Sequence, residues 1–200
     1  MTTLAAIDSR RESSTNGPAF VETDVEAFRA AMRQLASGVC LVAHSVDGAP
    51  AGMTATAVAS LSLEPPTLIV CLNRAASTYA GLAPGVAFGV SVLAADHREL
   101  AERFAGRTGV NEGERFREGR WLIPPSGAPL LWDALAAFEC EVEDIVERRT
   151  HAIVIGRVKH TTASAGGGAL VYWRGGYDQL GWNRDELSRA TGVSPQSARR

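Results

Sequence analysis

Four hydroxyl side chains stand an even number of positions apart in the stretch GMTATAVASLSLEPP, which spans residues 52–66. They are Thr54, Thr56, Ser60 and Ser62. Successive side chains of a strand point to opposite faces, so an extended chain places all four hydroxyls on one side and small apolar side chains on the other. A face rich in hydrogen-bonding groups with little bulk around it suits a planar heterocycle with polar edges. The alternative, a half-buried strand whose threonines and serines face water, stays open.

Short strands are expected to position this segment. The apolar run at 39–46 is followed by Asp47-Gly48, a strong hairpin signal that returns the chain into the hydroxyl segment. Pro65-Pro66 ends that segment, and a fully buried strand is predicted immediately after it. The further strands are predicted at Thr67–Leu72, Val86–Leu93, Phe138–Val142, Ile153–Val158 and Leu170–Trp173. The strands at Phe138–Val142 and Ile153–Val158 are expected to pair across a turn at 148–151.

Only short helices accompany these strands. A capping box of Thr23 with Glu26 predicts a helix whose apolar face is Val25, Phe28, Met32 and Leu35 and which ends at Gly38. A second short helix is predicted over 77–82. A third follows the capping pattern of Asp96 with Glu99 and stops at Gly106. Residues 107–135 are rich in glycine, proline and charge, and are predicted to be a long surface excursion of the kind that often covers a binding site.

This order of elements predicts a mainly β fold, a small antiparallel β-barrel with peripheral helices. The length of 200 residues fits one domain. We expect a disordered leader over 1–22, the domain over 23–182 and a flexible tail over 183–200.

Composition excludes several classes of partner and location. The net charge of −2 indicates neither nucleic acid nor an acidic membrane surface as a partner. No apolar run approaches the roughly 18 residues of a membrane helix, and no secretory signal is recognised at the start. Cys40, Cys71 and Cys140 are odd in number and lie in apolar runs, which is typical of buried thiols in a reducing compartment. A cytoplasmic protein is therefore predicted.

The sequence lacks the common catalytic motifs. It contains no GxGxxG after a strand, no P-loop, no HExxH, no CxxC and no GxSxG elbow. Its four histidines, at 44, 97, 151 and 160, show no metal-ligand spacing, so no metal site is predicted. An enzyme with this inventory is expected to take its chemistry from an organic cofactor.

Several motifs in order resemble the flavin reductase family of the FMN-binding split-barrel fold. They begin with Pro50–Ala57 and Ser62–Pro66, continue through Cys71–Thr78 and Arg103–Gly106, and end with Leu170–Tyr177. The resemblance covers about residues 25–182. It implies an antiparallel split barrel that passes hydride directly from NADH or NADPH to FMN or FAD, with no protein nucleophile. It further implies a homodimer that supplies reduced flavin to a separate oxygenase or halogenase.

The resemblance also assigns the contacts to the flavin. The ring-binding segment comprises Pro50, Ala51, Gly52, Met53, Thr54, Thr56 and Ala57, and a second segment comprises Cys71, Leu72 and Asn73. Ser77 and Thr78 match the phosphate site, to which Arg74, Arg103 and Arg107 can add charge-assisted bonds. Each residue also has a structural alternative, such as a helix cap for Ser77, a solvated charge for the arginines or a core position for Cys71.

Three further positions are assigned from the resemblance, and one of them is a weak match. The family's Gly-Asp-His triplet is Arg149-Thr150-His151 here, so only His151 is kept, and it is assigned to orienting the nicotinamide. Phe104 is expected to be a core residue whose edge reaches the cofactor. Tyr177 matches a family tyrosine, with core or dimer packing as the alternative. No residue is assigned a proton-transfer role. Because the triplet departs from the pattern, a flavin-binding protein or electron carrier without reductase activity remains the second hypothesis.

Overall fold

The structure is a computed structural model in which residues 22–164 and 167–181 are described. The expected leader, apart from residue 22, and the expected tail fall outside these ranges. The chain divides into two units, residues 1–32 and 33–200, which we describe separately. In the first unit, helix α1 spans Val25–Met32. Its cap is Asp24, whose Oδ1 accepts the amide of Ala27 at 2.8 Å, and not Thr23 as predicted.

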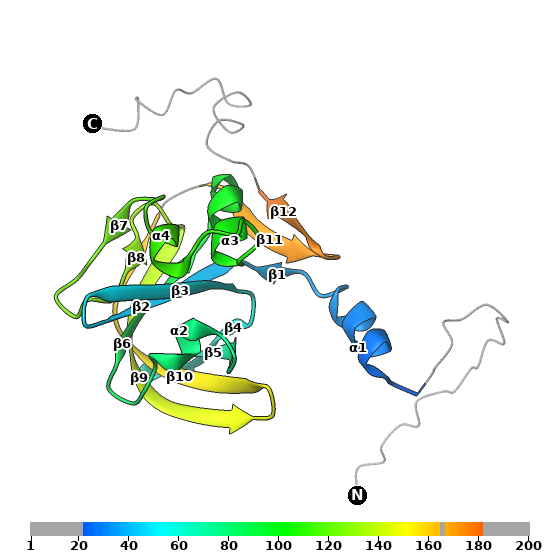
Figure 1. The fold of residues 1–200 in the computed structure, drawn as a ribbon, viewed down its shortest axis with the longest axis horizontal. Coiled ribbons are helices and arrows are strands. Elements are labelled where there is room, and N and C mark those ends of the chain that lie inside the picture. Colours follow the sequence, from blue (N-terminus) through cyan, green and yellow to red (C-terminus); the bar gives the residue numbers. More distant parts are fainter. Residues whose placement is uncertain (1–21, 165–166, 182–200) are drawn as a thin grey trace, which may run out of the picture. The chain divides into compact units, whose positions relative to one another are not determined.

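The second unit is built on one seven-stranded antiparallel sheet with the order β3-β2-β6-β9-β10-β5-β4 (Figure 1). Every neighbouring pair is antiparallel, so the predicted mainly β, antiparallel fold is confirmed. The strands are β2 (Cys40–Val46), β3 (Ala49–Ala55), β4 (Val58–Leu63), β5 (Pro66–Asn73), β6 (Ala87–Val92), β9 (Ala136–Arg148) and β10 (His151–Ala163).

The two edges of this sheet meet at one corner. Strands β3 and β4 are the outermost strands, yet only Thr56 and Ala57 separate them in the chain. The three peptide steps from one strand to the other span at most about 11 Å. The sheet is therefore curled into an open barrel whose seam lies between β3 and β4, and no ladder closes that seam in the described part of the chain.

The hydroxyl segment is two strands and not one, which corrects the opening expectation. The chain leaves β3 after Ala55, and β4 contains a register shift between Ser60 and Ser62. Thr56, Ser60 and Ser62 line one cleft, whereas Thr54 does not line it. Thr54 donates to the carbonyl of Ala101 at 2.7 Å. Ser62 donates to the carbonyl of Glu64 at 3.1 Å.

Both predicted hairpins are confirmed. Strands β2 and β3 pair from Val46↔Ala49 onward around Asp47 and Gly48, whose φ angles of 52° and 78° lie in the left-handed region that a tight two-residue turn requires. Strands β9 and β10 turn at Arg149, which has a φ of 53°.

The region 107–135 carries structure that its composition did not predict. It holds helix α4 (Glu112–Arg115) and the small hairpin of β7 (Trp121–Leu122) and β8 (Leu130–Leu131). Together with α3 (Arg98–Phe104) these elements lie on one side of β2 and β3, while α2 (Ser77–Ala80) lies on the other (Figure 1). Helix α3 follows a 3-10 turn, Ala95–His97, where the His97 ring and not Asp96 accepts a backbone amide, that of Ala94.

A third, three-stranded sheet completes the unit. It pairs β1 (Ser37–Gly38), β11 (Ala169–Trp173) and β12 (Gly176–Leu180) in the order β1-β11-β12. The last strand, β12, was not predicted. The glycine break expected at 166–168 lies partly outside the described residues.

Strand β2 separates two hydrophobic clusters. Val42 and Phe88 belong to the cluster inside the curled sheet, whereas Leu41 and Phe104 belong to the cluster beneath α3 and β8. Alternate side chains of one strand point to opposite faces, so β2 is buried on both sides and reads as a continuous apolar run.

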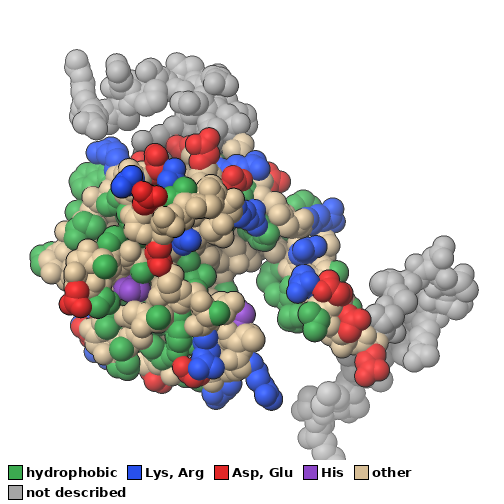
Figure 2. Space-filling view, in the orientation of Figure 1, with side chains coloured by type: hydrophobic (Ala, Val, Ile, Leu, Met, Phe, Trp, Pro, Cys, Tyr) green, Lys and Arg blue, Asp and Glu red, His purple; other side chains and the backbone are tan. Residues whose placement is uncertain are grey.

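No helix in the described ranges is long and apolar enough to cross a membrane. Acidic and basic side chains are interspersed on the visible face in Figure 2.

Candidate functional site

The predicted ring-binding segment lies along β3, paired with β2. Pro50, Ala51 and Met53 face Ser45, His44 and Val42 across the ladder. Strand β3 is an edge strand, because β2 is its only partner in the sheet among the described residues, and its Gly52 carbonyl accepts a hydrogen bond from Arg115. The polar backbone of an edge strand beside small side chains is of the kind that binds the polar rim of a flavin ring.

The seam brings the second predicted segment to the first. The amide of Cys71 donates to the carbonyl of Ala57 at 2.9 Å, which fixes β5 against the corner between β3 and β4. Strand β10 pairs with β5 so that His151 stands opposite Asn73 and Ala152 opposite the buried Leu72. Three stretches that are distant in sequence therefore converge on this corner, as the resemblance implies.

Arg74 lies at the same end of β5. Its amide donates to the carbonyl of Thr150 at 3.0 Å and its Nη1 to the carbonyl of Arg149 at 3.1 Å. Its Nη2 forms an ion pair with Glu147 at 2.8 Å. The guanidinium therefore ties the β9–β10 turn to the start of the α2 segment.

Ser77 and Thr78 open α2, which is shorter than the predicted helix. The helix has only four residues and no side-chain cap at its start, so it offers a single turn of amides to an anion. The Ser77 hydroxyl donates to Glu112 Oε1 at 2.6 Å. Thr78 is buried, and its carbonyl oxygen accepts a hydrogen bond from a side chain of β2.

That contact comes from His44, which the sequence analysis did not select. His44 is buried in β2, and its Nε2 lies 2.9 Å from the Thr78 carbonyl oxygen. Burial lowers the pKa of His44, so the ring is neutral and Nε2 carries the donated hydrogen. Its Nδ1 has no hydrogen-bond partner among the described residues. The only indication in the sequence is a histidine inside an apolar strand. Histidines that are merely buried and hydrogen-bonded in a core show the same pattern.

The lowered pKa of His44 predicts a pH-dependent stability. The pKa of His44 in the folded protein lies below the unfolded value of about 6.5. Between these two pKa values the unfolded chain binds the proton more readily than the folded chain, which favours unfolding. The stability that neutral His44 contributes is therefore fully present above pH 6.5 and is lost as the pH falls through the folded pKa. We expect the midpoint of thermal unfolding to fall between pH 7.5 and pH 5.5. The fall should be smaller in His44→Gln, and an equal fall in both proteins would contradict the assignment.

Arg115 is a second residue that the sequence analysis missed. Its Nη1 donates to the Gly52 carbonyl at 3.2 Å, and its buried Nε lacks a partner among the described residues. It lies in the region 107–135, where periodicity is too weak to indicate which side chains point inward. Arg115 therefore ties α4 to the ring-binding segment through the Gly52 carbonyl.

Aromatic rings back the ring-binding segment on the face of β3 that lies toward α3. The ideal Cβ position at Gly52 lies 3.0 Å from Phe104 and 3.0 Å from Phe116, so a side chain there requires these rings to shift. Phe104 is 1% exposed, and its ring centroid lies 4.9 Å from that of Phe116 and 5.6 Å from that of Trp121. Phe104 is thus a core residue that backs β3.

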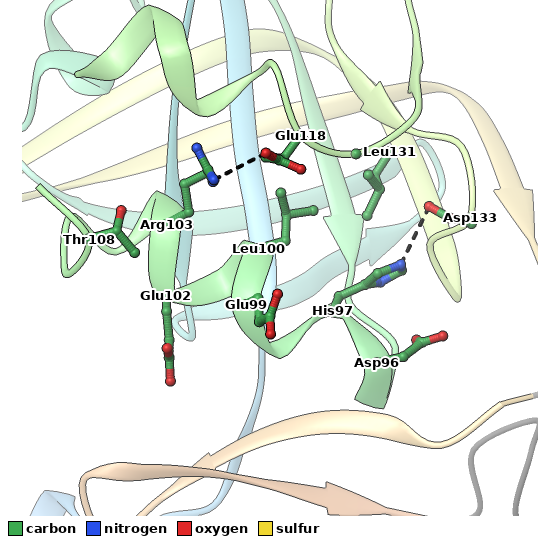
Figure 3. Close-up of a pocket in the computed structure, with 11 residues that line it drawn as sticks. Asp96, His97, Glu99, Leu100, Glu102, Arg103, Thr108, Glu118, Leu131 and Asp133 are labelled. Carbon is green, nitrogen blue, oxygen red and sulfur yellow. Dashed lines mark hydrogen bonds and ion pairs between the residues drawn. The ribbon is translucent and has the colours of Figure 1, made fainter. Parts of the chain in front are cut away.

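Three of the predicted residues lie away from this corner. Arg103 pairs with Glu118 at 3.4 Å and lines a cavity of about 570 Å³ that also contains His97 and Asp133 (Figure 3). Arg107 stacks against Tyr172 and Tyr177, at 5.7 and 5.4 Å from their ring centroids. Within one copy of the chain, Arg103, Arg107 and Tyr177 are therefore not brought to Ser77.

The described residues at the corner fit a flavin. Asn73, Arg74 and Ser77 are exposed polar side chains of the kind that binds a flavin, and β3 beside them carries small side chains. When bound, the flavin supplies the redox chemistry, and the chain supplies binding and orientation.

The chain is similar to known flavin reductases over most of its length. The model of the flavin reductase like domain family matches residues 32–181. The protein named FMN reductase (NADH) RutF of Methylorubrum extorquens strain DM4 is 40% identical over 169 residues, which are 84% of this chain and 79% of that protein.

Two solved structures are similar over most of the chain. BorF, the flavin reductase component of a bacterial two-component tryptophan halogenase, has a TM-score of 0.72 at 34% identity, covering 78% of this chain and 98% of that one. The NADH:FAD oxidoreductase SgcE6 of Streptomyces globisporus C-1027 has a TM-score of 0.74 at 28% identity, covering 82% and 98%. The resemblance read from the motifs is confirmed, and the chain belongs to the flavin reductase family.

Proposed function

We propose that this chain transfers hydride from NADH to free FMN. The observation that carries the proposal is the convergence of Gly52–Ala57, Cys71–Asn73 and His151 at the seam of the sheet. FMN and NADH are favoured because relatives at about 40% identity bear the name FMN reductase (NADH). FAD remains the competing flavin, since a neighbouring structure is an NADH:FAD oxidoreductase.

The residues at the corner act by binding and orientation. In this proposal the outer edge of β3 and the Asn73 side chain hold the flavin ring, and Ser77 and Arg74 hold its phosphate. His151 lies opposite Asn73 on the adjacent strand and orients the nicotinamide. Holding two reacting rings in one geometry supplies much of the acceleration of a direct transfer, which needs no protein nucleophile.

A single assay tests this function. Purified protein is mixed with NADH or NADPH and with added FMN, FAD or riboflavin, and nicotinamide oxidation is followed by absorbance. Oxidation that scales with added FMN supports the proposal, and the ratios of kcat/KM rank the flavins and nicotinamides. Flavin binding without nicotinamide oxidation for any pair would instead establish the alternative, a flavin-binding or electron-carrier protein of the same fold.

His151→Ala is expected to raise the KM for NADH or lower kcat about tenfold, while the Kd for FMN changes less than twofold. The size follows from the loss of one or two hydrogen bonds to a substrate, each contributing about 0.5–1.5 kcal/mol. Steady-state kinetics and flavin fluorescence titration separate the two effects. His160→Ala is the matched control, because His160 lies on the same strand and pairs with Glu139 at 2.7 Å. Unchanged kinetics in His151→Ala would remove the residue from the site.

We further propose that the reduced flavin is delivered to a separate oxygenase or halogenase. The support is that BorF is the reductase component of such a halogenase system. An oxygenase held behind a membrane permeable only to small molecules should turn over when this protein, NADH and FMN are supplied on the other side. Turnover only when both proteins share a compartment would contradict free diffusion of the flavin.

A homodimer is proposed from the surface beside the seam. Strand β4 is a sheet edge that exposes Leu61 and Leu63, the latter to 84%, next to a largely apolar cleft of about 510 Å³. An exposed apolar edge strand is a common pairing surface for another chain. Light scattering should give twice the chain mass, and Leu61→Lys with Leu63→Lys should shift the equilibrium toward the monomer.

The cytoplasm is the compartment we propose. Cys40, Cys71 and Cys140 are free thiols, and burial raises the pKa of Cys40 to about 11 and that of Cys140 to about 12. Unpaired, protonated thiols in the core fit a reducing environment. Labelling of intact and lysed cells with a membrane-impermeant reagent, followed by detection of this chain, distinguishes the compartments.

A further inference from the structure

The hydroxyl assigned to the flavin phosphate is already bound to a carboxylate. Ser77 Oγ donates to Glu112 Oε1 at 2.6 Å, a distance typical of a charge-assisted hydrogen bond. Glu112 lies in α4, far from Ser77 in the sequence, and among the described residues it is the hydrogen-bond partner of the Ser77 side chain. A phosphate oxygen and this carboxylate oxygen are acceptors for the same hydrogen.

Helix α4 holds Glu112 in place. Three residues further on, Arg115 donates to the Gly52 carbonyl at 3.2 Å, and Phe116 packs edge-on against the buried Phe104. The carboxylate is therefore carried by an element with two anchors on β3 and its support, and is not a freely moving surface charge.

The second group assigned to the phosphate is engaged in the same way. Arg74 Nη2 pairs with Glu147 Oε2 at 2.8 Å, and the other oxygen of Glu147 accepts the hydroxyl of Tyr79 at 2.7 Å. Ser77, the neutral donor, and Arg74, the cation, thus each have a carboxylate partner at this end of the site.

We propose that Glu112 is a specificity-determining residue whose carboxylate competes with the flavin phosphate for the Ser77 hydroxyl. The inference rests on the proposed function, because it assumes that the phosphate of FMN is bound at Ser77. Binding of FMN has to displace the Glu112 carboxylate from Ser77 or tolerate its charge. Riboflavin, which has the same ring and no phosphate, meets neither cost.

Electrostatics sets the size of this effect. The phosphate of FMN carries a charge of about −1.5 to −2 at pH 7. Two unit charges about 4 Å apart in water interact with about 1 kcal/mol, and salt screens the interaction over about 8–10 Å. The carboxylate is therefore expected to weaken FMN binding about five- to tenfold at low salt.

The test compares FMN with riboflavin in Glu112→Gln. The amide keeps the shape of the side chain and removes its charge. We expect the Kd for FMN, from fluorescence titration at low salt, to fall about five- to tenfold and the rate constant of FMN release to fall with it. The Kd for riboflavin should change less than twofold, and the gain for FMN should shrink in about 0.5 M salt.

The control is Glu114→Gln on the same helix. Glu114 pairs with Arg117 at the surface, at 3.2 Å, so its replacement removes an equal charge without touching Ser77. We expect no more than a twofold change in the Kd for FMN. Glu112→Ala serves as a second variant, and circular dichroism checks that it is folded. We expect the Kd for FMN to fall in this variant as well, while the Kd for riboflavin changes little.

Two results would overturn the proposal. An unchanged Kd for FMN in both Glu112 variants means that the carboxylate does not compete with the phosphate. Equal tightening for FMN and riboflavin means that the variants open the site mechanically. Failure of the proposed function gives a different signature, since the unmodified protein itself would then oxidise no NADH with any flavin.

Discussion

Replacing Phe104 with alanine is expected to lower the free energy of unfolding by about 3–5 kcal/mol. The side chain is 1% exposed and packs against Phe116 and Trp121 at centroid distances of 4.9 and 5.6 Å. Its loss removes buried apolar area and leaves a cavity that the surrounding rings fill only in part. Urea unfolding followed by tryptophan fluorescence and by circular dichroism measures the change.

The same substitution is expected to weaken flavin binding. Phe104 lies against Gly52 on the face of β3 toward α3, so the strand that carries the ring-binding segment loses its support. Trp132→Ala is the control, because that side chain is 59% exposed and its removal should cost less than 1 kcal/mol. A loss for Phe104→Ala no larger than that of the control would contradict the assignment of Phe104 to the core.

Gly81→Ala is expected to cost about 1–3 kcal/mol of stability and to weaken FMN binding. An ideal Cβ at Gly81 lies 2.1 Å from Cε1 of the buried His44 ring, so the ring has to move. Moving it breaks the hydrogen bond from Nε2 to the Thr78 carbonyl and releases the turn that presents Ser77.

The control for Gly81→Ala is Gly38→Ala. Nothing lies within 4 Å of an ideal Cβ at Gly38, and both glycines have backbone angles that alanine can adopt. Thermal unfolding and FMN titration of the two variants separate the clash from the general effect of adding a methyl group. Equal stability of the two proteins would show that the His44 pocket adapts without cost.

Local chemistry was enough to predict the hairpins and most strands. The turn at Asp47-Gly48 needs left-handed backbone angles, and the sequence supplies residues that adopt them. Strand β2 reads as a continuous apolar run because both of its faces are buried. The break at Thr56–Ala57 was missed because alternation continues through it, whereas the corner itself is imposed by the pairing of β4 with β5.

The candidate site was predicted only where the chain keeps the family's motifs. The segments at 50–57, 71–73 and 77–78 carry local signals in that order, and the structure brings them together. His44 and Arg115 reach the site through long-range packing of β2 and α4, and nothing in their neighbours along the chain marks them. The same reason explains why Arg103 and Arg107 lie elsewhere: the direction of a side chain on the short helix α3, or in the turn that follows it, depends on what these elements pack against.

The seam between β3 and β4 also has a consequence for how the protein folds. The hairpins β2–β3, β4–β5 and β9–β10 join neighbours in the chain, whereas the pairings β6–β9 and β5–β10 join distant segments. Long-range pairings require a large loss of chain entropy before they are rewarded, so they limit the folding rate. The corner that we propose as the flavin site is complete only after β5 has docked on β10. Flavin therefore binds no early hairpin, and its effect should be to slow unfolding while leaving the folding rate unchanged.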